Sequence, residues 1–163
     1  MKPVLCPSPR ALVQSGGGID APARIRVGTA DAGQLSRAAE VSAAILGGIC
    51  KVAIDPDAAF AVDVGRDPAL CGEAYRLSCG PEGCEIRAGT AQGVSRAFAT
   101  LAQLFIGGQI PALDIRDAPA LPLRGYMLDA SRDRVPARRT LLHILDALWL
   151  CKYNQFQLYV EHT

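Results

Sequence analysis

The sequence has few aromatic side chains, few histidines and no excess of charge of either sign. Its 17 basic and 16 acidic residues nearly cancel, which excludes the basic stripe of an electrostatic nucleic-acid binder. Aromatics make up 6% of the chain, so stacking platforms for bases or sugars are scarce. With only two histidines and no C-x-x-C pair, neither a zinc site nor another metal site is expected.

Long apolar runs are also missing from this chain. No window of about 18 uninterrupted apolar residues occurs, so neither a membrane span nor a membrane partner is expected. The first seven residues are broken by Pro3 and Pro7 and lack the apolar stretch of a signal peptide. A cytoplasmic location is therefore expected, with a leader removed by processing as the alternative.

What the chain does contain is enough apolar residues, 50% of the total, for a real core. After a Pro- and Gly-rich start over 1–22, interpreted as loop, alternation predicts strands at 25–27 and 60–64. Apolar residues at helical spacing predict a helix over 31–46. Asp31 is expected as its N-cap, and Gly47 and Gly48 as its stop.

A β-hairpin is predicted next, because residues 74–78 and 84–88 alternate on either side of a Gly-Pro-Glu-Gly turn. Cys79 and Cys84 flank this turn, and a disulfide between them is geometrically possible, although reduced thiols are the simpler expectation. A second helix over 91–106 follows, capped by Thr90 and ended by glycines.

The prolines between residues 111 and 122 predict a linker, with a domain boundary at 118. Residues 1–118 are expected to form an α+β domain: an antiparallel-leaning sheet with two helices on one face. Residues 119–163 then predict strand 123–130, an apolar helix over 136–153 and strand 155–161. Pro136 suits the first position of that helix, and Asn154 the position just beyond its end.

The stretch Arg-Gly-Tyr-Met-Leu-Asp-Ala-Ser-Arg stands at residues 124–132. It is similar to the first barrel strand of glycoside hydrolase family 20, the β-N-acetylhexosaminidases, and the resemblance covers about residues 60–163. The resemblance implies an enzyme that needs no cofactor. Pro136 and the Lys-Tyr-Asn-Gln-Phe stretch at 152–156 follow as they do in the family. Residues further upstream resemble the non-catalytic domain that precedes the barrel in this family, a domain that α-glucuronidases also carry. They are the Glu-Ala-Tyr-Arg-Leu stretch at 73–77, Ile86, Gly93, Thr100, Leu101, Gln103 and Leu104.

The resemblance implies that 119–163 is the beginning of a (β/α)8 catalytic barrel. It implies a hydrolase that removes terminal N-acetylglucosamine or N-acetylgalactosamine with retention, the substrate's acetamido oxygen acting as nucleophile. The family's catalytic Asp-Glu pair follows the fourth barrel strand. No catalytic residue is therefore expected within this segment, and the segment alone is expected to be inactive.

Five residues carry site predictions. Arg124 resembles the family arginine that binds the sugar's 3- and 4-hydroxyls, the alternative being a structural arginine paired with a carboxylate. Asp129 and Arg132 are expected at the rim, where an ion pair would hold the loop. Glu161 and His162 follow the second strand and are expected to contact substrate. The family often has Asp near that place, so this chain departs from it there.

The alternative to an enzyme is a binding or assembly module. In that case the apolar helix over 136–153 docks on a partner chain. An uncovered apolar helix would also drive self-association of the isolated segment.

Overall fold

The computed structural model describes residues 3–31, 33–131 and 135–161. They form two compact units, residues 1–119 and 120–163, and each is described by itself. Unit 1 is a layer of helices on a sheet, and unit 2 is a single strand–helix–strand element. No helix in the described ranges is long and apolar enough to cross a membrane.

Unit 1 is built on a sheet whose described part has seven strands in the order β1-β7-β5-β6-β4-β2-β3. Its β1, β7, β5 and β6 pair antiparallel, and its β6, β4, β2 and β3 pair parallel. The α+β class is confirmed, but the sheet is mixed rather than antiparallel-leaning. The strands are β1 (Ala11–Asp20), β2 (Arg24–Thr29), β3 (Ala53–Ile54), β4 (Ala61–Arg66), β5 (Tyr75–Gly80), β6 (Gly83–Ala88) and β7 (Gln109–Asp117).

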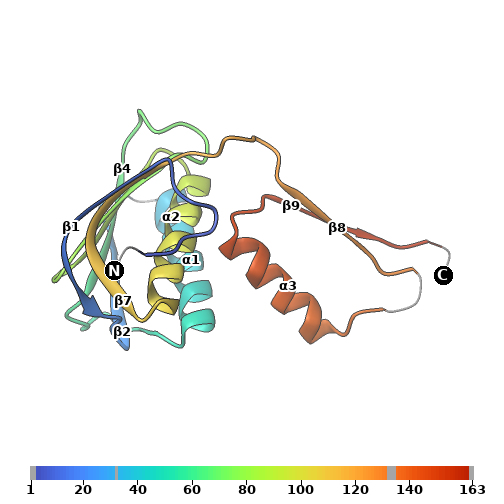
Figure 1. The fold of residues 1–163 in the computed structure, drawn as a ribbon, viewed down its shortest axis with the longest axis horizontal. Helices are drawn as coiled ribbons and strands as arrows, with labels where there is room; N and C mark the ends of the chain where they lie inside the picture. Colours follow the sequence, from blue (N-terminus) through green and yellow to red (C-terminus); the bar gives the residue numbers. More distant parts are fainter. Residues whose placement is uncertain (1–2, 32, 132–134, 162–163) are drawn as a thin grey trace. The chain divides into compact units, whose positions relative to one another are not determined.

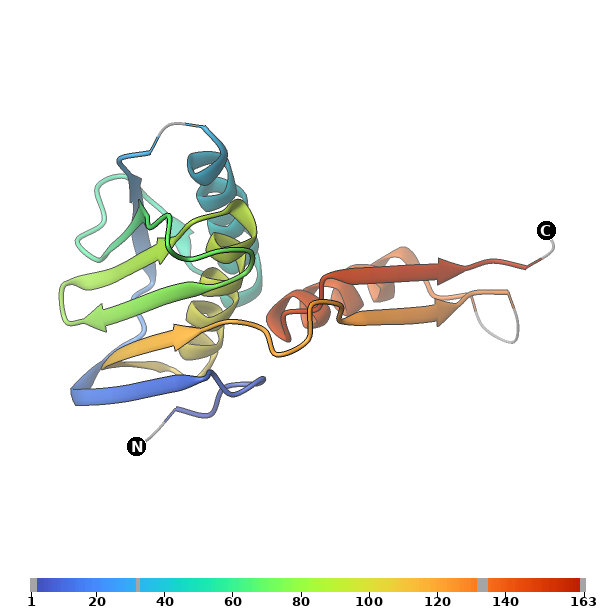
Figure 2. The same ribbon diagram turned by 90° about the horizontal axis from the view of Figure 1, so that it is seen from above.

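Two helices, α1 (Gln34–Cys50) and α2 (Ala91–Ile106), cover one face of this sheet, as predicted (Figures 1 and 2). The core lies between the layers, because every second strand residue turns toward the helices. The largest fully buried side chains come from both layers: Ile25, Leu35, Leu46, Tyr75, Leu77, Ile86, Phe98, Leu101, Leu104, Ile110, Leu113 and Ile115.

The predicted ends of α1 are wrong. The helix continues through Gly47 and Gly48 to Cys50, and Lys51 adopts the left-handed conformation (φ 59°) that ends it. Glycine costs a helix only about 1 kcal/mol, and burial of Leu46 beside these glycines outweighs that cost. Asp31 is not the cap either, because Gly33 holds that position and the Asp31 carboxylate pairs with Arg66.

The prediction for α2 is confirmed at both ends. The Thr90 side chain accepts a hydrogen bond from the Gly93 N–H at 3.1 Å, which satisfies one of the free donors of the first turn. The helix ends at Gly107, and Gly108 follows with φ 77°, a conformation that glycine adopts without steric cost.

The strands β1 and β7 were not predicted. The glycines of β1 lie in a bulge, because the register shifts between Gln14 and Gly18 opposite β7. A Cβ at Gly18 would lie 3.0 Å from the Ile110 carbonyl oxygen, so the close approach of the two strands favours glycine there. Pro111 lies opposite this bulge, where a missing N–H is tolerated.

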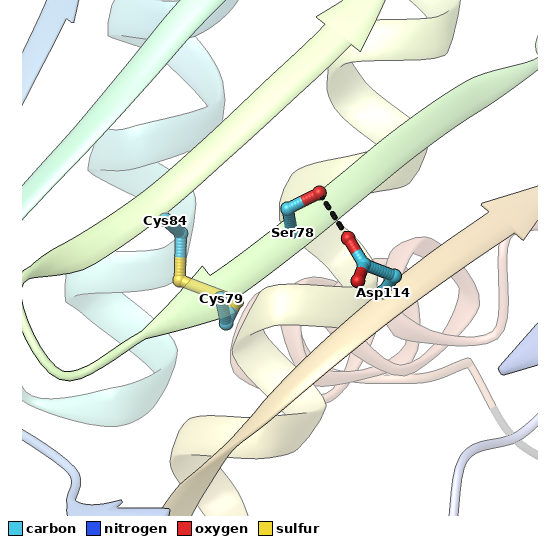
Figure 3. Close-up of a disulfide and its surroundings, with 4 residues drawn as sticks. All are labelled: Ser78, Cys79, Cys84 and Asp114. Atoms are coloured by element: carbon cyan, nitrogen blue, oxygen red, sulfur yellow. Dashed lines mark hydrogen bonds between the residues drawn. A yellow bond between two sulfur atoms is a disulfide. The ribbon is translucent and has the colours of Figure 1, made fainter. Parts of the chain in front are cut away.

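The predicted hairpin is confirmed as β5 and β6, with Cys79 directly opposite Cys84. Their side chains point into the buried face and form a disulfide (Figure 3). Reduced thiols were the simpler expectation, and the structure has the bonded alternative.

A buried polar cluster surrounds Tyr75 in the core. Its hydroxyl group shares a hydrogen bond of 2.5 Å with Thr100 and donates another of 3.1 Å to the Asp117 carboxylate. Burial is the main reason that the pKa of Tyr75 lies well above its usual value, and the negative charge of Asp117 raises this pKa further. The neutral hydroxyl thus joins β5 to α2 and to the end of β7.

Unit 2 consists of β8 (Gly125–Asp129), α3 (Arg138–Leu150) and β9 (Gln155–Tyr159). The two strands run parallel, from Gly125 opposite Gln155 to Asp129 opposite Tyr159. The strand–helix–strand order is as predicted, but the helix is shorter at both ends. Ala137 is its N-cap, so Pro136 precedes the helix instead of opening it, and the left-handed residue after its end is Lys152 (φ 61°) rather than Asn154.

No residue of α3 is buried in the described structure, although the helix carries leucines on several sides. Burial of such side chains elsewhere contributes about 1.5–3 kcal/mol each. The apolar side chains of α3 are half-buried or exposed, so part of that stabilisation is not realised.

Candidate functional site

The candidate site lies at the carboxyl ends of β8 and β9, because ligands of parallel α/β sheets bind at that edge. Asp129 is the last residue of β8, and Glu161 lies two residues beyond β9. Since Asp129 is opposite Tyr159 in the register, both residues belong to the same edge. The predicted residues Arg132 and His162 lie outside the described residues.

The Asp129 carboxylate is held by its own loop. One of its oxygens accepts hydrogen bonds from the Ser131 N–H at 2.8 Å and from the Ser131 hydroxyl group. A carboxylate bound in this way fixes the turn that follows the strand. Ser131 is the partner that these contacts show, and the rim role expected for Asp129 stays a prediction.

Arg124 lies at the opposite end of the strand pair, directly before β8. Its Nε donates to the Lys152 carbonyl oxygen at 2.9 Å, and its Nη1 donates to the Leu121 carbonyl oxygen at 2.6 Å. These contacts join the chain before β8 to the chain after α3. In these two contacts the partners of the Arg124 side chain are carbonyl groups.

The structure brings Asp129 and Glu161 to one edge but does not bring Arg124 to them. Asp129 lies five positions after Arg124, which is roughly 16 Å along an extended strand. A sugar bound at the carboxyl edge would therefore lie a whole strand length from the Arg124 backbone. The sugar contact of Arg124 stays a prediction.

Asn154 is a structural residue of this unit whose role was not predicted. Its side-chain oxygen accepts from the Arg124 N–H at 2.9 Å, and its side-chain nitrogen donates to the Pro122 carbonyl oxygen at 2.7 Å. The Asn154 N–H donates to the Arg124 carbonyl oxygen at 3.0 Å. One side chain and its backbone thus hold the beginnings of β8 and β9 together. Asparagine beside the start of a strand is the only local signal of this role.

No group of three or more His, Cys, Asp or Glu side chains capable of holding a metal ion occurs in the described ranges. The described side chains at this edge of the strand pair are the carboxylates of Asp129 and Glu161 and the hydroxyl group of Ser131. A carboxylate accepts hydrogen bonds from the hydroxyl groups of a polyhydroxylated ligand, and a hydroxyl group both accepts and donates them.

Comparison with known proteins places this architecture in a family. The family model described as glycosyl hydrolase family 20, domain 2, matches residues 2–118. The chain belongs to glycosyl hydrolase family 20.

Curated relatives agree with this placement. A β-hexosaminidase of Akkermansia muciniphila is 36% identical over 98 residues, which are 57% of this chain and 20% of that protein. β-Hexosaminidase subunit A1 of Dictyostelium discoideum is 31% identical over 88 residues, which are 50% of this chain and 16% of that protein. The chain thus spans a fifth or less of the length of these relatives.

Solved structures share the fold. An inactive mutant of the exo-β-N-acetylglucosaminidase from Vibrio harveyi matches 94% of this chain and 25% of its own, with a TM-score of 0.78 and 23% identity. A Streptomyces plicatus β-hexosaminidase mutant in complex with its product GlcNAc matches 95% of this chain and 34% of its own, with a TM-score of 0.74 and 23% identity.

Proposed function

We propose that the protein to which this chain belongs is a glycoside hydrolase that removes terminal β-linked N-acetylhexosamine, GlcNAc or GalNAc. The observation that carries the proposal is the match of residues 2–118 to domain 2 of glycosyl hydrolase family 20. The β-hexosaminidases that are 31–36% identical to this chain support it. The binding or assembly module considered as an alternative is not favoured by these relatives.

Unit 2 is proposed to be the start of a (β/α)8 barrel. A parallel strand pair joined by a helix is the repeating element of such barrels, and their active sites lie at the carboxyl ends of the strands. The unburied leucines of α3 support the proposal, because the outer helices of a barrel are packed on its strands and on neighbouring helices. Under this proposal Glu161 and His162 contact the sugar, and Asp129 and Arg132 shape the rim.

The proposed reaction retains the anomeric configuration and uses the substrate's acetamido oxygen as nucleophile. It needs an acid to protonate the leaving oxygen and a second carboxylate to orient the acetamido group. Neither role is assigned to a residue of this chain. The described part of the chain therefore contributes the support and part of the rim.

A chromogenic N-acetyl-β-glucosaminide assay tests this proposal. We expect the purified 163-residue chain to show no turnover above the buffer rate. The protein expressed from the complete reading frame should hydrolyse both the gluco and the galacto substrate, and a β-glucoside without the acetamido group serves as the control. Turnover by the short chain alone, or equal hydrolysis of the control substrate, would contradict the proposal.

The role of Arg124 is tested in the complete enzyme with Arg124→Lys and Arg124→Ala. If Arg124 binds the sugar hydroxyl groups, KM should rise by about tenfold or more, because hydrogen bonds from a charged group contribute about 1.5–3 kcal/mol. If it only joins the chain segments around Leu121 and Lys152, the thermal midpoint should fall while KM stays unchanged. Asn154→Ala is the matched structural control, because the uncharged Asn154 side chain joins the same segments through Arg124 and Pro122.

A further inference from the structure

The face of the unit 1 sheet that is turned away from the helices carries three arginines in one row. Arg76 on β5 lies directly opposite Arg116 on β7 and directly opposite Arg87 on β6. All three side chains are exposed. Neighbouring strands are about 4.8 Å apart, so the row places the Cα atoms of three arginines within roughly 10 Å.

Such a row is unfavourable in the absence of a ligand, because like charges directly opposite each other destabilise a sheet. Arg87 is relieved by Glu85, whose carboxylate accepts from its Nε at 2.8 Å. Among the described residues, Arg76 and Arg116 have no hydrogen-bond or ion-pair partner of this kind. Two adjacent guanidinium groups are therefore available to an anion.

A second row, two residues further along each strand, is acidic and polar. Ser78 lies opposite both Asp114 and Glu85. The Ser78 hydroxyl group donates to the Asp114 carboxylate at 2.6 Å (Figure 3). Residues two apart on a strand are separated by roughly 7 Å, so a positive row and a negative row run side by side on one surface.

Arg76 and Arg116 of the first row line a single hollow of about 580 Å³ together with the second row, Ser78, Asp114 and Glu85. This volume is within the size range of small-ligand sites. Ala11 and Val13 of β1 form part of its wall. The hollow thus presents guanidinium groups to one end of a ligand. It presents two carboxylates and a hydroxyl group to the other end.

We propose that this hollow binds an acidic sugar residue of a glycan. Arg76 and Arg116 would bind its carboxylate or sulfate group, since the planar guanidinium matches such oxygens in pairs. Asp114, Glu85 and Ser78 would accept hydrogen bonds from its ring hydroxyl groups. A phosphate polymer fits less well, because its next charge would meet Asp114 and Glu85. The choice of a glycan rests on the proposed function, whereas the two charged rows do not depend on it.

Binding is measured by isothermal titration of the 163-residue chain at low salt with three tetrasaccharides. Hyaluronan carries carboxylates, chondroitin sulfate carries carboxylates and sulfates, and chitotetraose is neutral. We expect the acidic probes to bind at least about tenfold more tightly than chitotetraose, and to weaken as salt is raised. Equal affinity for both acidic probes assigns the carboxylate as the recognised group, and binding of chondroitin sulfate alone assigns the sulfate.

The variant Arg76→Gln/Arg116→Gln should lower the affinity for the acidic probes by about tenfold or more. Its thermal midpoint should be equal to or above that of the parent, because the repulsion within the row is removed. Arg37→Gln on α1, an exposed arginine of the helical layer, is the matched control and should bind as the parent does. Absence of binding to both acidic probes, equal binding of chitotetraose, or equal losses in the two variants would overturn the proposal. This readout uses no hydrolysis, so its failure leaves the proposed reaction untouched.

Discussion

Replacing Arg96 with methionine should destabilise unit 1 by about 3–5 kcal/mol, the usual cost of removing one partner of a buried ion pair. Arg96 on α2 donates from Nε and Nη2 to the two carboxylate oxygens of Glu73, both at 3.2 Å. The two side chains are only 10% and 13% exposed. The variant therefore leaves the Glu73 carboxylate in a poorly hydrated place without its guanidinium partner. The midpoint of urea unfolding, followed by circular dichroism, measures the loss.

Two further variants identify the cause of that loss. Glu73→Gln/Arg96→Met removes both charges and should regain most of the stability, because an apolar or neutral replacement of a buried pair is often close to neutral. Arg37→Met breaks the exposed pair with Glu40, whose side chains are 80% and 65% exposed. It should cost at most about 0.5 kcal/mol. Equal losses in Arg37→Met and Arg96→Met would show that burial of the pair is not the cause.

The position of this ion pair explains why so much depends on it. Glu73 comes two residues before Tyr75, and Arg96 lies one helical turn before Thr100, with which the Tyr75 hydroxyl group shares its hydrogen bond. The contact between Glu73 and Arg96 and the contact between Tyr75 and Thr100 are therefore neighbours: their residues are two positions apart beside β5 and four positions apart on α2. Fixing α2 on the sheet in this way places the end of β7, whose Asp117 joins the same cluster.

Elements with strong local signals could be predicted from the sequence, and those that depend on distant partners could not. The cap at Thr90 and the turn between β5 and β6 involve residues close together in the chain. In contrast, the paired residues of β1 and β7 are about 90 to 105 positions apart in the chain, and the glycines of β1 and Pro111 of β7 are locally typical of breaks. Only the bulge, which needs both strands, makes those residues suitable for a sheet.

The same distinction applies to the candidate site. The order strand, helix, strand places Asp129 and Glu161 at one edge, because parallel strands end on the same side. The actual partners of Arg124 could not be read from its motif. They depend on where the chain leaves α3, and a left-handed Lys152 with an Asn154 side chain sets that path. The row of arginines could likewise not be predicted from the sequence, because it arises only from the register of three strands.

Reducing the bond between Cys79 and Cys84 should lower the free energy of unfolding by about 2 kcal/mol, the chain-entropy value for so short a loop. The bond closes a loop with a sequence separation of 5 inside the β5–β6 hairpin, so it constrains the unfolded chain far less than a long-range bridge would. The variant Cys79→Ala/Cys84→Ala should lose at least as much, because both side chains are buried. Urea unfolding with and without a thiol reductant measures the difference.

Exposed thiols provide the control for this experiment. Cys6→Ser/Cys71→Ser should unfold at the same urea concentration as the parent, because both cysteines are free and exposed. Cys50 should not interfere, since burial raises the pKa of its thiol to about 11 and keeps it in the unreactive protonated form near neutral pH. An unchanged midpoint on reduction would mean that the hairpin ladder alone holds these strands.

The same bond bears on the expected cytoplasmic location, because stable disulfides belong mainly to oxidising compartments. Alkylation of intact cells followed by mass spectrometry distinguishes the two cases. If the protein stays in the cytoplasm, Cys79 and Cys84 should both be alkylated, and the chain should work without the stability that the bond adds. If they remain unmodified until a reductant is added, the protein reaches an oxidising compartment, and the hairpin bond forms part of its working structure there.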